Sequence, residues 1–347
     1  MQPAGCCQQQ SKMKGSAIAM WAAMLLAVEA CTSGHDLMPT SGGRPYEVLV
    51  VGADSQAVAV VADGLRTLTM EGLPQPEKVF DVSAIVAGGL NQLTRYARSI
   101  VMVTTGIDTL RHPTVSYQLN AYARPQLILH LRAADVGQLQ RYNIYNVRAM
   151  ERQLVLHELN ATIASLRERH SEVAKAMIDS LFGVRMWVPQ DLTKWKCARD
   201  FLWLSNDAVQ GVQNVCVYRI PGSTLTKEQA LHKRDSVMRA NVPGETAGSY
   251  MTTVGNSVTA RMLTAEGAAD KPQQLELRGL WAMEGEAMGG PFVSLSSVRG
   301  DSTLVVEAFV YAPGMRKRNQ LRRLEASIHT LAFNAAQNAN ETIEQHN

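Results

Sequence analysis

The first 31 residues of the chain restrict where its fold can begin. Lys12 and Lys14 precede an apolar run at residues 17–28 that contains no acidic or basic side chain, and Cys31 follows Ala30. A membrane-spanning helix needs about 20 apolar residues, so this run is too short to cross a bilayer. Its length and flanks are typical of a secretory signal. We therefore expect the fold to form from the residues after it, which suffice for one large domain or two of ordinary size.

Residues 28–31, VEAC, resemble the lipobox of bacterial lipoproteins, in which acyl chains are attached to the cysteine. Glu29 departs from that pattern, because a small or apolar residue is usual at its position. The Gln-rich stretch ahead of Met13 is unlike the start of a signal, whereas a chain begun at Met13 has an ordinary one. We predict a signal peptide within residues 1–31 that starts at Met13, and lipidation of Cys31.

The segment that follows favours a tether over a buried helix. Residues 32–45 are rich in Thr, Ser, Gly and Pro, a composition that suits a flexible linker. The alternative is that residues 17–28 form the first helix of a cytoplasmic domain and that Cys31 only fills an apolar site. A tethered protein would reside in the cell envelope. Neither Thr32 nor Ser33 is the aspartate that retains lipoproteins in the inner membrane. Asp36 alone does not make the acidic pattern that directs lipoproteins to the cell surface, so we predict the outer membrane, facing the periplasm.

Composition argues against several functional classes. The chain has 46% hydrophobic and 19% charged residues and a formal net charge of +3, and loss of the signal, with two lysines and one glutamate, leaves about +2. Such a balance predicts no nucleic-acid partner. No His-Glu-x-x-His, Cys-x-x-Cys, P-loop or Gly-x-Ser-x-Gly element occurs. Gly52 follows a strand-like run but lacks the glycine spacing of a dinucleotide site. We therefore expect no cofactor, no metal and no catalytic residue, and we favour a binding protein over an enzyme.

Two cysteines remain after Cys31. In an oxidising periplasm Cys197 and Cys216 would pair as a disulfide if their strands were neighbours. Two separately buried thiols are the alternative, and spacing in the sequence does not decide between them.

The first half of the chain predicts a mixed sheet. Apolar runs at residues 47–52, 79–86 and 100–104 indicate strands, with a helix over 56–68 and a short helix over 89–99 between them. Residues 115–131 contain Pro125 and favour a strand or loop leading to another strand, not a crossover helix. Residues 135–182 then have helical spacing, as one long helix or two, that closes at Gly183.

The second half predicts an antiparallel meander covered by helices. Strands are expected at the following residues: 184–189, 201–205, 212–220, 250–254, 257–263, 274–283, 291–298 and 302–311. Thr226 and Gln229 form a capping box for a helix over 226–240, and a last helix is expected over 315–333. An antiparallel sheet with one wet face needs cover on the other, which these helices supply.

These patterns together indicate an α+β fold with mixed and antiparallel sheets covered by helices, with two similar α/β-sandwich subdomains as one arrangement. The predicted boundaries are an N-terminal subdomain at residues 46–185, a C-terminal subdomain at 186–333 and a polar tail at 334–347.

Several long segments resemble one family. They are HKRDSVMRANVPGE (232–245), LRGLWAMEGEAMGGPFVS (277–294) and FVYAPGMRKRNQLRRLEASIHTL (309–331), with YEVLVVG (46–52). They are similar to an uncharacterised lipoprotein family of Bacteroidota, known as a domain of unknown function (DUF4837-like). The resemblance spans the chain after the signal and implies an envelope lipoprotein of α+β architecture, but no activity, substrate or catalytic residue.

The candidate ligand-binding residues cluster in the second half: His232, Arg234, Arg278, Trp281, Gly289 and Gly290. The tryptophan would stack on a sugar, the arginines would hold an anion, and the glycines would let the backbone approach a ligand. The alternative is a hairpin turn at residues 289–291, a half-buried tryptophan and ordinary ion pairs. The hypothesis is binding of an envelope protein, a glycan or a small ligand.

A periplasmic hydrolase is the alternative function. It would need His232 and Asp235 to converge with Glu284 and Glu286, which share a face if they lie on one strand. 

A basic run near the C-terminus is also a candidate surface: Arg316, Lys317, Arg318, Arg322 and Arg323. It would face lipid phosphates near the tether or an acidic partner, or form a solvated helix start.

Overall fold

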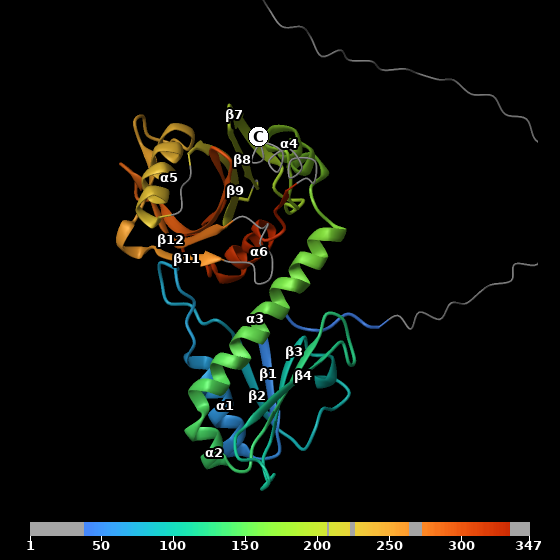
Figure 1. The fold of residues 1–347 in the computed structure, drawn as a ribbon. Coiled ribbons are helices and arrows are strands. Elements are labelled where there is room, and N and C mark those ends of the chain that lie inside the picture. Colours follow the sequence, from blue (N-terminus) through green and yellow to red (C-terminus); the bar gives the residue numbers. More distant parts are fainter. Residues whose placement is uncertain (1–37, 207, 223–225, 264–272, 334–347) are drawn as a thin grey trace, which may run out of the picture. The chain divides into compact units, whose positions relative to one another are not determined.

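The computed structural model describes residues 38–206, 208–222, 226–263 and 273–333 (Figure 1). The predicted signal, Cys31 and the polar tail lie outside these residues. The described residues form one compact unit. None of the helices in the described part of the chain has the length and apolar character needed to cross a membrane.

The first half is built on a five-stranded sheet with the strand order β2-β1-β3-β5-β4. Its strands are β1 (Glu47–Gly52), β2 (Asp81–Val86), β3 (Ser99–Thr104), β4 (Thr114–Leu119) and β5 (Leu127–Arg132). β1, β2, β3 and β5 are parallel, whereas β4 returns antiparallel to β5. The mixed sheet expected from residues 115–131 is thus confirmed.

Helices cover one face of this sheet (Figure 1). They are α1 (Ser55–Thr67), α2 (Val136–Arg141) and α3 (Asn143–Glu168). The carboxylate of Asp54 caps α1 by accepting hydrogen bonds from the N–H groups of Gln56 and Ala57. A negative charge therefore already occupies the helix end that a dinucleotide phosphate would use. The opposite face of the sheet carries only a small apolar cluster around Ile100 and Ile128.

Two local expectations were wrong, one in each half of the chain. Residues 89–99 form a loop with one 3-10 turn, Thr94–Tyr96, because the Asn91 side chain accepts hydrogen bonds from the N–H groups of Leu93 and Thr94. The expected strand at 184–189 is reduced to β6 (Val184–Arg185), which pairs with β15 (Ala332–Phe333).

The helical region after residue 135 is divided more finely than the two alternatives expected. It contains α2, α3 and α4 (Glu172–Phe182), and α4 ends at Gly183, whose φ of 70° is left-handed. Glycine adopts that conformation without the strain of a side chain, so the predicted end is confirmed.

The second half is an eight-stranded antiparallel sheet, ordered β10-β12-β13-β14-β9-β8-β7, with β11 paired to β12. Its strands are β7 (Lys194–Ala198), β8 (Phe201–Ser205), β9 (Val212–Pro221), β10 (Tyr250–Thr253), β11 (Thr259–Leu263), β12 (Gln274–Glu284), β13 (Gly289–Arg299) and β14 (Ser302–Tyr311). A 3-10 turn, Gly255–Ser257, joins β10 to β11. The predicted meander is confirmed in β12, β13 and β14.

A helix covers each face of this sheet. The strands curve around α5 (Lys227–Asn241) in Figure 1, and α5 packs through Ala230 and Met238. α6 (Arg318–Ile328) packs on the other face through Leu321 and Leu324. The cap predicted for the first helix is present, since the Thr226 hydroxyl accepts a hydrogen bond from the Gln229 N–H. α6 is shorter than the helix expected over 315–333.

The chain thus has the predicted α+β fold. Both halves layer helices on a sheet, but the first sheet is mostly parallel and the second is antiparallel. The subdomain boundary at residue 185 stays a prediction.

Candidate functional site

Arg234 is buried in the second half of the chain and is paired there with another buried residue. Its side chain is 2% exposed, and Nη2 lies 2.7 Å from Oε1 of Glu307, which is fully buried. Nη1 donates to the Thr253 hydroxyl at 2.6 Å, and the guanidinium lies 4.1 Å from the centre of the Phe292 ring. Every one of these contacts is internal, so Arg234 holds α5 on the sheet and is not presented to a ligand.

Arg278 is likewise used within the fold. It pairs with Glu325 of α6 and lies 3.9 Å from Glu276 on its own strand. Arg322 pairs with the other oxygen of Glu325 at 3.0 Å. Burial alone would raise the pKa of Glu325, but the two guanidiniums of Arg322 and Arg278 hold it at about 2.

Three residues at this ion-pair network carry atoms that can bind a metal ion. Glu276, Glu325 and His329 place ligand atoms within 4.8 Å of one another. Two guanidinium groups already neutralise Glu325, so a divalent cation would add positive charge beside them. These residues fit an ion-pair network better than a metal centre.

Trp281 and the two glycines have packing roles. Trp281 is 2% exposed and meets Phe309 edge to face, with ring centres 5.5 Å apart, so its ring is not free to stack on a sugar. A Cβ on Gly290 would lie 2.0 Å from the backbone oxygen of Val310, which explains the glycine by close strand packing. The hairpin turn suggested for residues 289–291 was wrong, because both glycines lie in β13 and the turn precedes them.

The hydrolase residues are not assembled into one constellation. His232 is exposed on α5, and none of the hydrogen bonds or ion pairs within the described residues joins it to the other three. Asp235 accepts a hydrogen bond from Thr253, and Glu286 accepts one from Ser249. The hydrogen bond from Ser249 lowers the pKa of Glu286, which fixes this carboxylate as an acceptor that closes a loop.

Cys197 and Cys216 do not form a disulfide in the structure. Cys197 is exposed on β7, Cys216 is buried on β9, and β8 lies between them. Neighbouring strands are about 4.8 Å apart, so two strand spacings exceed the Cα separation of about 4.4–6.8 Å that a disulfide allows. Burial raises the pKa of the Cys216 thiol, which keeps it protonated.

The basic run near the C-terminus is also largely paired. Arg318 is buried and binds Asp81, Arg323 binds Asp191, and Arg316 binds Asp81. These ion pairs support contacts between segments distant in the sequence, although Arg316 and Arg323 also each line a hollow in the protein.

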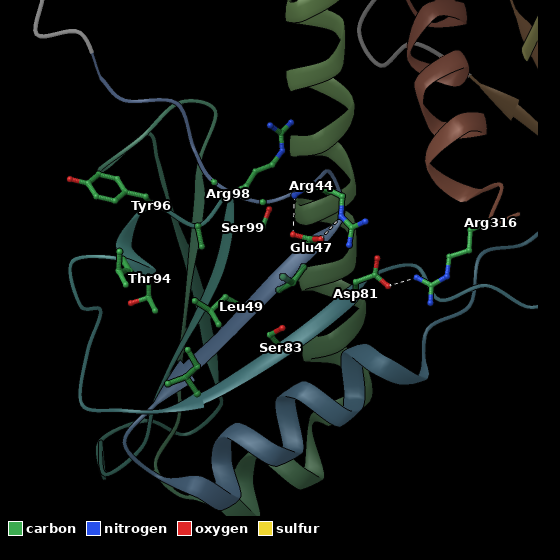
Figure 2. Close-up of a pocket in the computed structure, with 16 residues that line it drawn as sticks. Arg44, Glu47, Leu49, Asp81, Ser83, Thr94, Tyr96, Arg98, Ser99 and Arg316 are labelled. Carbon is green, nitrogen blue, oxygen red and sulfur yellow. Dashed lines mark hydrogen bonds and ion pairs between the residues drawn. The ribbon is translucent and has the colours of Figure 1, made fainter. Parts of the chain in front are cut away.

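The first half carries a hollow on the open face of its sheet. This sheet hollow has a volume of 680 Å³ and is lined by Leu49 of β1 and Ser83 of β2. Figure 2 shows two ion pairs along one side, Arg44 with Glu47 and Asp81 with Arg316, while Thr94 and Tyr96 stand on the other side. Its charged rim is therefore close to neutral.

A second hollow, of 920 Å³, lies between the end of α3 and the segments that lead into the strands. We call it the arginine hollow, because five arginines line it: Arg44, Arg98, Arg124, Arg169 and Arg323. Glu168 is the one acidic residue in its lining. Arg44, Arg98 and Arg323 have carboxylate partners. Arg124 and Arg169 are exposed and make no ion pair within the described residues.

Arg98 lines both hollows, and its side chain is held in place by a buried carboxylate. Its Nε lies 2.8 and 2.9 Å from the two carboxylate oxygens of Glu158, a residue of α3 that is 1% exposed. Burial raises the pKa of Glu158, and the Arg98 guanidinium offsets part of that rise. Among the described residues, the terminal nitrogens of Arg98 make no hydrogen bond. They remain able to donate two parallel bonds to an anion.

The field of Arg98 also reaches the neighbouring histidine. Burial, together with the Arg98 charge, lowers the pKa of His157 to about 4. His157 is therefore neutral at pH 7, and it does not cancel or extend the positive charge of the hollow.

The sequence did not point to this site. Arg98, Arg124 and Arg169 are far apart from one another in the sequence, and Arg98 and its partner Glu158 are 60 positions apart. The nearest signal was the Thr, Ser, Gly and Pro segment, whose end supplies Thr40 and Arg44 to the lining.

Comparison with known proteins gives family matches without a described function. Residues 171–330 match a domain of unknown function, DUF4837, and residues 41–167 match a second domain of unknown function, DUF8532. No curated protein matches the chain.

A solved structure from Bacteroides thetaiotaomicron VPI-5482 is similar at 12% identity, with a TM-score of 0.21. The match covers 44% of this chain and 45% of that one, so this chain spans less than half of that protein's length.

Proposed function

We propose that this chain, which carries a DUF8532 domain followed by a DUF4837 domain, is a cell-envelope lipoprotein that binds an anionic ligand in its arginine hollow. In this proposal the protein binds the ligand and does not convert it chemically. The ligand is an envelope molecule that presents phosphate or carboxylate groups.

The envelope location rests on the segment before the fold. The lipobox-like VEAC ends in Cys31, and a tether composition follows it. Several acyl chains hold a protein on a membrane stably without a transmembrane helix. Thr32 and Ser33 after the cysteine support the outer membrane, facing the periplasm.

The binding proposal is carried by Arg98. A buried carboxylate fixes its Nε, so the side chain is ordered before any ligand arrives, and its terminal nitrogens stay available. Preordering of this kind lowers the entropy that binding costs. Arg124 and Arg169 add two unneutralised charges beside it.

Lipidation is tested by partitioning the full chain, produced in a bacterial host, between detergent and water. The wild type should enter the detergent phase and incorporate labelled fatty acid, whereas Cys31→Ser should do neither. Equal labelling of the variant would place the acyl chains elsewhere or refute them.

Binding is tested with inorganic pyrophosphate as the probe, on the mature chain that starts at residue 31 with Cys31→Ser. A ligand that binds the native state raises its melting temperature as the ligand concentration passes Kd. Arg98→Lys keeps a cation for Glu158 but loses the planar fork, so it should weaken this effect. No stabilisation of the wild type at millimolar pyrophosphate would contradict anion binding.

A further inference from the structure

We infer that the anion recognised by the arginine hollow is the phosphate headgroup of a membrane phospholipid. The inference rests on the proposed function and specifies its ligand. The folded body would then touch the surface of the membrane that holds Cys31.

The covalent chain keeps the hollow close to that membrane. Thr40 lines the hollow and follows Cys31 by nine positions. An extended chain spans at most about 3.6 Å per residue, so the hollow lies no more than about 32 Å from an anchored cysteine. Arg44 and Pro45 in the same lining come directly after the tether. Thr40 is nearer to Cys31 in the chain than any residue that lines the sheet hollow.

The charges of the hollow match phosphate. Arg124 and Arg169 have no carboxylate partner within the described ranges, and Glu168 is the one acid that lines the hollow with them. A guanidinium donates two parallel hydrogen bonds to a phosphate, a geometry that lysine lacks. Basic side chains close to an anionic leaflet also gain attraction from its surface potential.

The sheet hollow, which adjoins the arginine hollow at Arg44 and Arg98, carries exposed apolar side chains. Leu93 is 84% exposed and lines the sheet hollow, which shares Arg44 and Arg98 with the arginine hollow. Ile85 in the same lining is 38% exposed. Cationic side chains together with exposed apolar side chains are the combination that interfacial membrane binding uses.

The test uses the same non-lipidated mature chain, so that the acyl anchor does not contribute. Sedimentation measures its binding to vesicles of phosphatidylcholine and phosphatidylglycerol in equal parts, and to phosphatidylcholine alone. Arg124→Ala with Arg169→Ala should weaken binding to the mixed vesicles about 30-fold. The control, Arg111→Ala with Arg152→Ala, removes the same charge from exposed arginines outside both hollows and should stay within about threefold of the wild type. Leu93→Ser should weaken binding less than the first pair.

Each outcome decides the inference. Loss with the hollow pair alone supports it, and equal loss with the control pair overturns it, since overall charge would then explain binding. If pyrophosphate stabilises the chain but the mixed vesicles do not bind, the headgroup inference fails and the proposed anion site stands. If neither probe binds, the proposed function fails as well.

Discussion

The two halves of the molecule use their arginines in opposite ways. In the second half helices cover both faces of the sheet, and Arg234 and Arg278 are paired inside the fold with Glu307 and Glu325. In the first half one face stays open, and Arg98 keeps its terminal nitrogens free of hydrogen bonds among the described residues. A conspicuous sequence context therefore does not make an arginine a ligand residue. The outcome depends on whether the terminal nitrogens of the guanidinium are buried in contacts within the fold, as in Arg234, or line a hollow, as in Arg98.

The largest effect should come from breaking the buried pair of the second half. Glu307→Gln removes the buried carboxylate of Arg234 and leaves the partly exposed Asp235, 3.4 Å from Nη1, as its remaining carboxylate partner among the described residues. Unfolding by denaturant should show a loss of about 3–5 kcal/mol. Replacing both residues, Arg234→Met with Glu307→Leu, should recover most of that loss. A loss below about 1 kcal/mol for the single variant would mean that Asp235 alone compensates the charge of Arg234.

The second effect concerns acid stability of the second half. The pKa of Glu325 is about 2 in the fold, against an ordinary value near 4.5, so its ionised form stabilises the native state above that ordinary value. This contribution, about 3 kcal/mol, is lost as pH falls from about 4.5 through 2. Glu325→Gln should flatten the stability curve in that window. An unchanged slope would contradict the ion-pair network.

A smaller effect in the first half should appear at higher pH. The pKa of His157 is about 4 in the fold and 6.5 for a free side chain, so the unfolded chain takes up a proton first. Stability from this group is complete above pH 6.5 and falls as pH drops toward 4. His157→Gln should remove that dependence of stability on pH. Denaturation of both proteins at several pH values measures it. If the variant keeps the wild-type slope, another group titrates there.

The smallest effect on stability should come from the arginine hollow itself. Arg124→Ala with Arg169→Ala removes exposed side chains without ion pairs in the described part of the chain, so the free energy of unfolding should change by about 0.5 kcal/mol or less. A large loss would assign these residues to the fold, as with Arg234, and would remove the contrast between the halves.

Local features were predictable from the sequence, whereas pairings were not. Thr226 caps its helix through the Gln229 N–H, and residues 302–311 form the expected strand, because both depend on neighbours in the chain. Glu307 meets Arg234 across 73 positions, and no local pattern encodes that contact. The candidate site could not be predicted for the same reason, because its residues come together only when α3 lies against the sheet.

Hydrogen–deuterium exchange with and without inorganic pyrophosphate tests the contrast most directly. We predict slower exchange at residues 40–46, 96–99 and 161–169, which line the arginine hollow or lead into it, and no change in α5 and β14 around Arg234. Protection around Arg234 with none at the arginine hollow would contradict the account.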